Sequence, residues 1–211
     1  MASEEGLSDA AGLAQRLRTA VADERVLAAI ASIPRERFVP DSERARSYEN
    51  VALPIAHGQT ISQPLVVARM LEALTLAPGD RVLDVGTGSG YHAALLALLA
   101  GRVWTIERHP ELAARAQQTI QGLGLDNVEF IVGDGWEGVR ESAPFDAINV
   151  AAAAGDRPPE ALEQQLALGG RMVAPVGEGR QYLVLTRRTE GGFRRERLEA
   201  VRFVPLVREG E

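Results

Sequence analysis

The chain has 211 residues, and its 23 basic residues are all arginine. It contains no lysine, no cysteine and only three histidines. The missing lysine excludes Schiff-base chemistry and a standard P-loop, and the missing cysteine excludes thiol nucleophiles, disulfides and thiolate metal sites. Any chemistry must therefore come from hydroxyls, carboxylates, arginines, backbone groups or a bound cofactor.

The length suits one domain, residues 1–211, with a sizeable core. We divide it into N-terminal helices with a loop (1–78) and a ligand-binding core (79–211). The net charge of −6 disfavours a nucleic-acid partner. The N-terminus lacks a signal-peptide pattern, and the longest apolar run, 93–100, is too short to span a membrane. We therefore expect a cytoplasmic protein with no membrane partner, acting as a monomer.

The first third of the chain predicts helices and one irregular loop. Two helices fall within residues 7–32, where the helical period of the first continues to Val21 and Asp23 caps the second. A loop rich in turn-forming residues follows at 51–64. The next helix is predicted over 64–74, with a proline at its first position, where the missing N–H costs nothing.

From residue 79 onward, strands and helices alternate. Short apolar strands are predicted at 81–85, 102–107, 128–132, 145–150 and 171–176. Helices are predicted at 90–100, 110–121 and 158–167. Two final strands, around 180–188 and 193–204, form a hairpin through Glu190-Gly191-Gly192. The pattern indicates an α/β fold with a mostly parallel sheet covered on both faces and an antiparallel edge, and it leaves the order of the C-terminal strands open.

The most informative segment, VLDVGTGSGYHAALLA, joins the first core strand to its helix. Gly86, Gly88 and Gly90 allow positive φ and let a ligand approach the backbone. Their spacing, G-x-G-x-G, differs from the dinucleotide pattern G-x-G-x-x-G, and Asp84 is better placed near a cationic ligand than near a pyrophosphate. The segment resembles the S-adenosylmethionine motif of class I methyltransferases. The alternative is a tight turn that binds nothing.

Acidic residues at the ends of the next two strands extend this candidate site. Glu107 lies 21 residues after Gly86, where a carboxylate can accept both hydroxyls of a ribose. Asp134 can accept from an adenine amino group, and Gly135 lets the ring lie close to the backbone. The alternatives are a solvated charge at a strand end for Glu107 and an ordinary turn for Gly-Asp-Gly. Asp146, inside the fourth strand, is either a ligand-side acid or a structural residue.

The loop before the core carries Gln59-Thr60-Ile61-Ser62-Gln63-Pro64. Ser62 is a candidate helix N-cap, and a hydroxyl with exposed N–H groups at a helix start also suits a carboxylate. His57, in the same loop, is a candidate for the substrate cleft. His92 and His109 are predicted at or just before the first turns of two core helices. The three histidines are too scattered for a metal site or a catalytic triad, so we expect no metal.

Together these residues resemble the protein-L-isoaspartate O-methyltransferase family. The resemblance runs from IPRERFVP (33–40) to VRFVPLV (201–207), and its most specific segments are LPIAHGQTISQP, VLDVGTGSGYHAALLA, VGDGWEG, APFDAINVAAAA and LGGRMVAPVG. Methyltransferases in general share the glycine segment, whereas GQTISQP and VPLV narrow the resemblance to this family. Ala56, where the family often has glycine, and Gly155, where a proline is common, depart from it.

The resemblance implies a doubly wound, Rossmann-like α/β fold with a mostly parallel seven-stranded sheet, an antiparallel C-terminal edge and N-terminal helices. It implies that S-adenosylmethionine methylates the α-carboxyl of L-isoaspartyl residues in damaged proteins and peptides, leaving S-adenosylhomocysteine. The methyl ester then closes to a succinimide without the enzyme. Ser62 would bind the carboxylate, beside Thr60 and His57. The cofactor residues would be Asp84, Gly86, Gly88, Gly90, Glu107, Asp134 and Gly135.

This reaction suits the missing residue types. A carboxylate is already ionised at neutral pH, so no general base is required, and the protein has to hold donor and acceptor in line. Two alternatives remain: a class I methyltransferase with another substrate, and a homologue that binds the cofactor without catalysis. The glycine spacing disfavours a third, a nicotinamide-dependent dehydrogenase.

Overall fold

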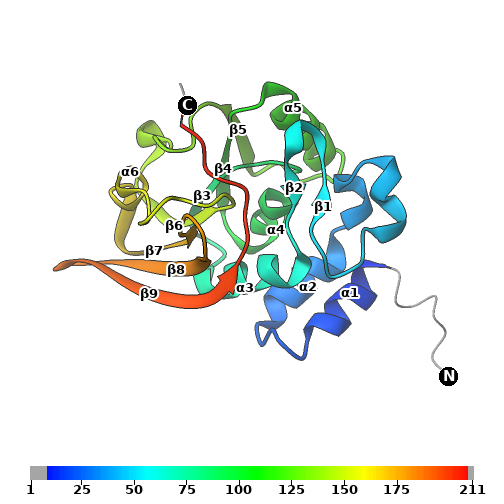
Figure 1. Cartoon of the computed structure of the whole chain (residues 1–211), viewed down its shortest axis with the longest axis horizontal. Coiled ribbons are helices and arrows are strands. Elements are labelled where there is room, and N and C mark those ends of the chain that lie inside the picture. Colours follow the sequence, from blue (N-terminus) through cyan, green and yellow to red (C-terminus); the bar gives the residue numbers. More distant parts are fainter. Residues whose placement is uncertain (1–8, 209–211) are drawn as a thin grey trace.

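The computed structural model describes residues 9–208 (Figure 1). Two short helices, α1 (Ala10–Leu17) and α2 (Glu24–Ser32), begin where Asp9 and Asp23 accept backbone N–H groups of the first turn. The predicted helix start at residues 7–8 lies outside the described residues. The prediction placed the end of α1 too late: the N–H groups of residues 20 and 21 both bond to the carbonyl of Leu17, which forms a tight turn.

The predicted loop between α2 and the next helix has more structure than its sequence suggests. It contains 3-10 turns at Arg35–Phe38, Asp41–Arg46 and Ala56–Gly58, and a small antiparallel sheet of β1 (Leu53–Pro54) and β2 (Thr60–Ile61). Helix α3 (Pro64–Leu74) has the predicted bounds. Ala56 departs from the family pattern without strain, because the left-handed conformations fall on His57 and Gly58.

A seven-stranded sheet forms the centre of the molecule. Its strands, in spatial order, are β5 (Val128–Val132), β4 (Arg102–Glu107), β3 (Arg81–Val85), β6 (Phe145–Val150), β7 (Leu166–Val176), β8 (Gln181–Thr189) and β9 (Gly192–Val201). Neighbours from β5 to β7 are parallel, and the pairs β7–β8 and β8–β9 are antiparallel. The mostly parallel, doubly wound sheet with an antiparallel edge is confirmed. The last three strands follow one another in chain order.

The predicted helix over 158–167 is wrong in extent. Helix α6 (Glu160–Glu163) has four residues, and β7 begins at Leu166, five residues earlier than predicted. Leu162 and Leu166 are spaced for a helix, but Leu166 pairs with Phe145 in the sheet, and both leucines fill the core beneath it. Pairing with a neighbouring strand therefore overrides the local helical spacing.

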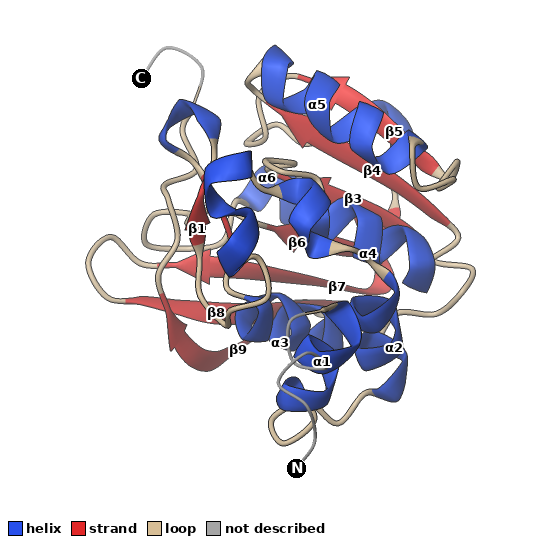
Figure 2. Ribbon diagram, turned by 90° about the vertical axis from the view of Figure 1, so that its right-hand side faces the viewer, coloured by secondary structure: helices blue, strands red, loops and turns tan. Residues whose placement is uncertain are grey.

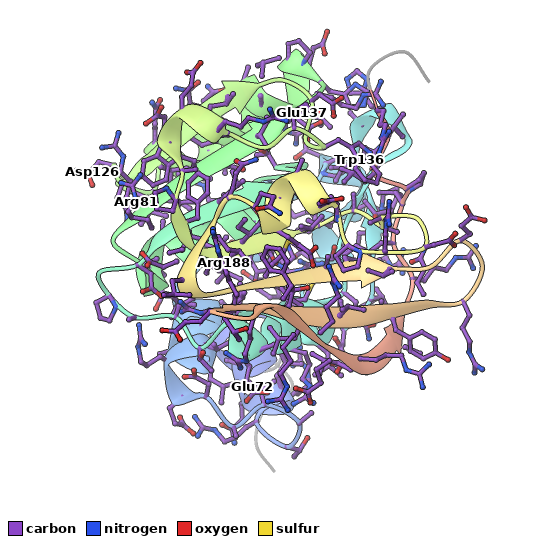
Figure 3. All side chains as sticks on the ribbon, turned by 90° about the vertical axis from the view of Figure 1, so that its left-hand side faces the viewer. Glu72, Arg81, Asp126, Trp136, Glu137 and Arg188 are labelled. Atoms are coloured by element: carbon purple, nitrogen blue, oxygen red, sulfur yellow. The ribbon has the colours of Figure 1, made fainter. Side chains whose placement is uncertain are left out.

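The two faces of the sheet are covered unequally. Helices α1 to α3, α4 (Tyr91–Leu99) and α5 (Pro110–Gln121) lie over one face (Figure 2). The segment after β5 and the short α6 cover the other. There the Trp104 and Phe145 rings lie 5.5 Å apart, and the Arg81 and Arg102 guanidinium groups lie 4.5 and 4.9 Å from the Trp104 ring. Arg81 is labelled in Figure 3. Among residues 9–208, no helix is both long and apolar enough to cross a bilayer.

Asp146 has a structural role at the amino end of the sheet. Its carboxylate accepts the N–H of Arg81 at 2.8 Å, and its carbonyl accepts from the Arg171 guanidinium at 2.9 Å. These contacts join β3, β6 and β7 at the end of the sheet where those strands begin. The reading of Asp146 as a ligand-side acid is therefore wrong.

The edge hairpin is anchored to α6 by one buried carboxylate. Glu163 is fully buried and accepts from the Thr186 hydroxyl at 3.1 Å and from two Arg195 nitrogens at 2.7 and 2.5 Å. A buried carboxylate that loses its cation keeps its desolvation cost without the compensating attraction. Arg195 therefore connects β9 to the body of the protein.

We expect Arg195→Met to lower the free energy of unfolding by about 2 kcal/mol, because it leaves the Glu163 carboxylate buried with one weak donor. Arg194→Met, at the neighbouring exposed position on β9, is the matched control and should change it by less than about 0.5 kcal/mol. Urea unfolding of both variants measures the difference. Equal losses would contradict an anchoring role for this pair.

Candidate active site

A cleft opens at the carboxyl ends of β3, β4 and β6, the edge where parallel sheets bind ligands. It encloses about 850 Å³ of empty space, including open solvent at its mouth. Its walls come mainly from five segments, with Val67 and Gly135 completing them: the loop 59–62, the glycine loop with the start of α4, residues 106–109, residues 151–152 and residues 204–207. Figure 1 shows β2 and the C-terminal segment, in red, crossing the front of this edge.

The three glycines of the loop after β3 have two different functions. Gly86 and Gly88 line the cleft with φ of 89° and 52°, and a Cβ at either would meet no atom nearer than 3.8 Å. Both adopt a left-handed backbone conformation, and without a side chain they let a ligand approach the backbone closely. Gly90 lies behind the cleft: a Cβ there would approach the Cβ of Ala116 on α5 to 2.9 Å. Gly90 therefore allows two helices to pack closely, and its expected contact with the cofactor stays a prediction.

Asp84 lies one layer below the cleft and does not line it. Its carboxylate is fully buried and accepts from the Asn149 amide at 2.8 Å and the Thr105 hydroxyl at 2.9 Å. The Thr105 hydroxyl in turn lies 2.6 Å from that of Thr87 in the glycine loop. Burial raises the pKa of Asp84 to about 7, although both hydrogen bonds lower it. Asp84 therefore supports the loop from beneath, and its expected contribution to cofactor binding stays a prediction.

Glu107 joins two loops that line the cleft. Its two oxygens accept the backbone N–H groups of Gly88 at 2.9 Å and His109 at 3.0 Å, and the residue is 6% exposed. The reading of Glu107 as a solvated strand-end charge is wrong. Each carboxylate oxygen has a second lone pair, so the group can hold the loops and still accept from a ligand.

Asp134 and Gly135 follow β5 at the far end of the cleft. Gly135 lines it, and a Cβ there would lie 2.7 Å from Cγ1 of Val85, so only glycine fits. The Asp134 carboxylate accepts the N–H of Trp136 at 2.8 Å and faces an adjoining pocket. The Trp136 indole, labelled in Figure 3, donates to the carbonyl of Leu206 at 3.0 Å. Sequence reasoning missed this bond, which holds the C-terminal segment over the cleft.

Ser62 lines the opposite end of the cleft, with Thr60 beside it. The N-cap of α3 is Gln63, and the Asn50 side chain accepts the N–H of Leu65 at 2.9 Å, so the reading of Ser62 as the helix cap is wrong. Within the described part of the chain, the Ser62 hydroxyl has no hydrogen-bond partner. It is therefore available to a ligand in the cleft.

His57 lies at the rim, outside the lining of the cleft. Its ring stacks on that of His109, with centroids 4.7 Å apart, and its Nε2 lies 3.7 Å from a carboxylate oxygen of Glu111. His109 lines the cleft in its place. His57 therefore lies at the entrance of the cleft, stacked on His109, and its expected role in substrate binding stays a prediction.

Arg35 is a site residue that sequence reasoning missed, although it stands in the quoted IPRERFVP segment. It is fully buried, and its guanidinium donates to the carbonyls of Ser47 at 2.8 Å and Ser62 at 3.0 Å. It also lies 4.9 Å from the ring of Tyr91 at the start of α4. Burial lowers the pKa of Arg35 to about 10, which leaves it charged at neutral pH. Arg35 thus joins the Ser62 loop to the helix that follows the glycine loop.

We expect Asp84→Asn to remove a pH dependence of stability. The folded pKa of about 7 lies above the ordinary value of 3.8, so the folded protein keeps a proton that the unfolded chain releases. The free energy of unfolding therefore falls, by on the order of 3 kcal/mol, as pH rises from about 4 to about 7, and it levels off above.

The Asp84→Asn variant carries no such proton and is nearly isosteric, so its stability should change less over the same range. Urea unfolding of both proteins at pH 5 and pH 7.5 measures the two differences. Parallel changes would show that Asp84 is ionised in the folded state.

Comparison with known proteins gives consistent matches. A family model described as protein-L-isoaspartate(D-aspartate) O-methyltransferase matches residues 10–211. A protein-L-isoaspartate O-methyltransferase of Koribacter versatilis is 55% identical over 89% of this chain and 84% of its own, and one of Roseiflexus castenholzii is 53% identical over 90% and 88%.

Solved structures agree with these matches. A putative protein-L-isoaspartate O-methyltransferase of Plasmodium falciparum, in complex with S-adenosyl-L-homocysteine, is 29% identical, with a TM-score of 0.83 over 94% of this chain and 98% of its own. A second structure of a protein-L-isoaspartate O-methyltransferase is 30% identical, with a TM-score of 0.82 over 92% of this chain and 64% of its own. The similarity therefore covers the whole of the described fold.

Proposed function

Because this chain belongs to the protein-L-isoaspartate(D-aspartate) O-methyltransferase family, we propose that its cleft binds the acceptor carboxylate at Ser62 and the methyl donor along the glycine loop. The enzyme transfers a methyl group from S-adenosylmethionine to L-isoaspartyl residues of damaged proteins and peptides. The observation that carries the site assignment is that one cleft contains both features the reaction needs. It has a serine hydroxyl without a hydrogen-bond partner at one end, and the glycine loop and the Glu107 carboxylate at the other.

The residues of the cleft fit S-adenosylmethionine. We assign Gly86 and Gly88 to its methionine part, because both line the cleft and neither carries a side chain that would project into it. Glu107 is assigned to the ribose. Asp134 and Gly135 are assigned to the adenine, because Gly135 lines the far end of the cleft with backbone alone and Asp134 lies in the adjoining pocket. When bound, the cofactor supplies a methyl group activated by a sulfonium and leaves as S-adenosylhomocysteine.

The acceptor side requires positioning and no proton transfer. A carboxylate is ionised at neutral pH and is already the nucleophile. We propose that the Ser62 hydroxyl donates to one of its oxygens and leaves the other free to face the methyl group, with Thr60 shaping the wall beside it. Arg35 keeps Ser62 in place through its backbone carbonyl. Holding donor and acceptor in line and in contact supplies the rate enhancement.

The organisation of the chain supports action as a single-domain monomer. The N-terminal part, 1–78, contributes α1 to α3 to the same core as α4 of the 79–211 part. We propose that the enzyme acts in the cytoplasm on isoaspartyl proteins, with no nucleic-acid or membrane partner, since its net charge is negative.

We expect the wild-type enzyme to label an isoaspartyl peptide from radiolabelled S-adenosylmethionine and to leave the matched aspartyl peptide unlabelled. Equal labelling of the two peptides would favour a methyltransferase of another specificity. Calorimetric binding of the cofactor without labelling of either peptide would favour a non-catalytic homologue.

Two variants should separate the acceptor and donor sides. We expect Ser62→Ala to lower turnover about 10- to 100-fold, the value of a hydrogen bond to a charged group, with little change in cofactor affinity. Glu107→Gln should instead weaken cofactor binding by about 10-fold or more, because an amide cannot accept from both Gly88 and His109. Steady-state kinetics and calorimetry with S-adenosylhomocysteine measure the two effects. Wild-type turnover in Ser62→Ala would remove the role assigned to Ser62.

A further inference from the structure

A groove continues from the acceptor end of the cleft along the C-terminal segment. Thr60, Ser62 and Val204 line both the cleft and this groove, and residues 200–204 form its opposite wall. A further depression shares residues 200–202 and extends to residues 178–181. We call this continuous path, from Ser62 past Arg202 to Arg180, the Arg202 groove.

Two arginines lie at opposed backbone positions in the far part of the groove. Strands β8 and β9 pair Gln181 with Val201, so Arg180 and Arg202 occupy the next opposed positions. Both are exposed, and within residues 9–208 neither forms an ion pair with an acidic side chain. Like charges at directly opposed positions repel each other. An acidic group placed between them would remove that repulsion.

The groove also lies in the basic region of an acidic protein. Residues 178–208 contain eight arginines and four glutamates, whereas the whole chain has 23 basic and 29 acidic residues. Glu178 is the one acidic side chain among the residues that form the groove. These arginines lie away from the proposed cofactor site, which is at the other end of the cleft. They are close to the part of the substrate that extends outward from the acceptor carboxylate.

We infer that the Arg202 groove holds the stretch of substrate polypeptide next to the isoaspartyl residue and favours substrates with acidic side chains in that stretch. The inference rests on the proposed function, because Ser62 fixes the position of the isoaspartyl group. An extended chain rises about 3.3 Å per residue, so side chains roughly two to four residues away reach Arg202 and Arg180. The groove extends from Ser62 in one direction only, so the charge preference applies to residues on one side of the isoaspartyl residue, either before it or after it.

A different explanation of these arginines is protection of the sheet edge. Strand β9 is the last strand of the sheet, and charged side chains on such a strand hinder pairing with another molecule. In that case every exposed arginine of the hairpin would act alike. Arg194, which directly opposes Arg187 on the same pair of strands, supplies the matched control.

The test uses isoaspartyl peptides that differ only in flanking charge. Three glutamates, three lysines or three alanines are placed before or after the isoaspartyl residue, beginning two residues from it. For the wild-type enzyme we expect KM to be about fivefold lower with glutamate than with lysine on one flank only, and the difference to shrink at high salt. Similar KM values for all peptides would overturn the inference.

Charge reversal locates the effect. Arg202→Glu should invert the order, so that lysine-flanked peptides have the lower KM, and Arg180→Glu should act in the same direction. Arg194→Glu should leave the order unchanged, since eight residues along β9 place it about 26 Å from Arg202, well beyond the Debye length of about 8 Å. An equal effect of Arg194→Glu and Arg202→Glu would overturn the inference in favour of general surface charge.

The two proposals fail in different ways. If no isoaspartyl peptide is methylated, the proposed function fails. Fluorescence anisotropy of the same peptides, labelled and mixed with the full-length protein, then still tests whether the groove binds acidic peptides. Tighter binding of the glutamate series, lost in Arg202→Glu, supports the Arg202 groove, and binding that ignores flanking charge overturns it.

Discussion

The cleft depends on a small group of buried polar contacts at the carboxyl ends of the three central strands. Thr105 on β4 and Asn149 on β6 both donate to the Asp84 carboxylate on β3 below the glycine loop, and the Thr87 hydroxyl in the loop bonds to that of Thr105. A buried carboxylate is costly unless donors satisfy it, so these two donors stabilise the common end of the three strands. The glycine loop is therefore held in place by the strand ends beneath it.

Glu107 fixes the loops above these strands in the same way, by accepting hydrogen bonds. Because its two oxygens accept from Gly88 and His109, the loops after β3 and β4 are held at a set separation, and the space between them is the middle of the cleft. Trp136 closes the far side through its bond to Leu206. Donor site, acceptor site and C-terminal segment are therefore one connected assembly, which suits a reaction whose main requirement is alignment.

The acceptor side is built by a different device. Arg35 is a buried cation bonded to backbone carbonyls, and it holds the 47–62 region against the first turn of α4. The absence of lysine and cysteine from the chain removes other routes to catalysis but costs this reaction nothing. The nucleophile arrives with the substrate, and the residues that matter are a hydroxyl, two carboxylates, an arginine and glycines.

Local pattern determined most of the strands and helices of the core, because their apolar periods are clear and glycine or proline marks many of their ends. It also predicted Ser62, Gly86, Gly88, Glu107 and Gly135 as site residues, and all five line the cleft. The last four lie at strand ends, which meet at one edge of a parallel sheet. It failed where contacts distant in sequence decide the outcome. The pairing of Leu166 with Phe145 shortened a predicted helix to α6.

Contacts distant in sequence also give residues roles that the local pattern did not predict. Asp84, Gly90 and His57 have the residue types a ligand site needs, but their partners Asn149, Ala116 and His109 come from other elements. Arg35 gave no local signal, because its importance comes from carbonyls 12 and 27 residues away. The sequence by itself determined the order of elements, the family and the chemistry. Only the tertiary structure decided which side chains face the cleft and which hold it from behind, because burial and long-range hydrogen bonds exist only once the sheet has formed.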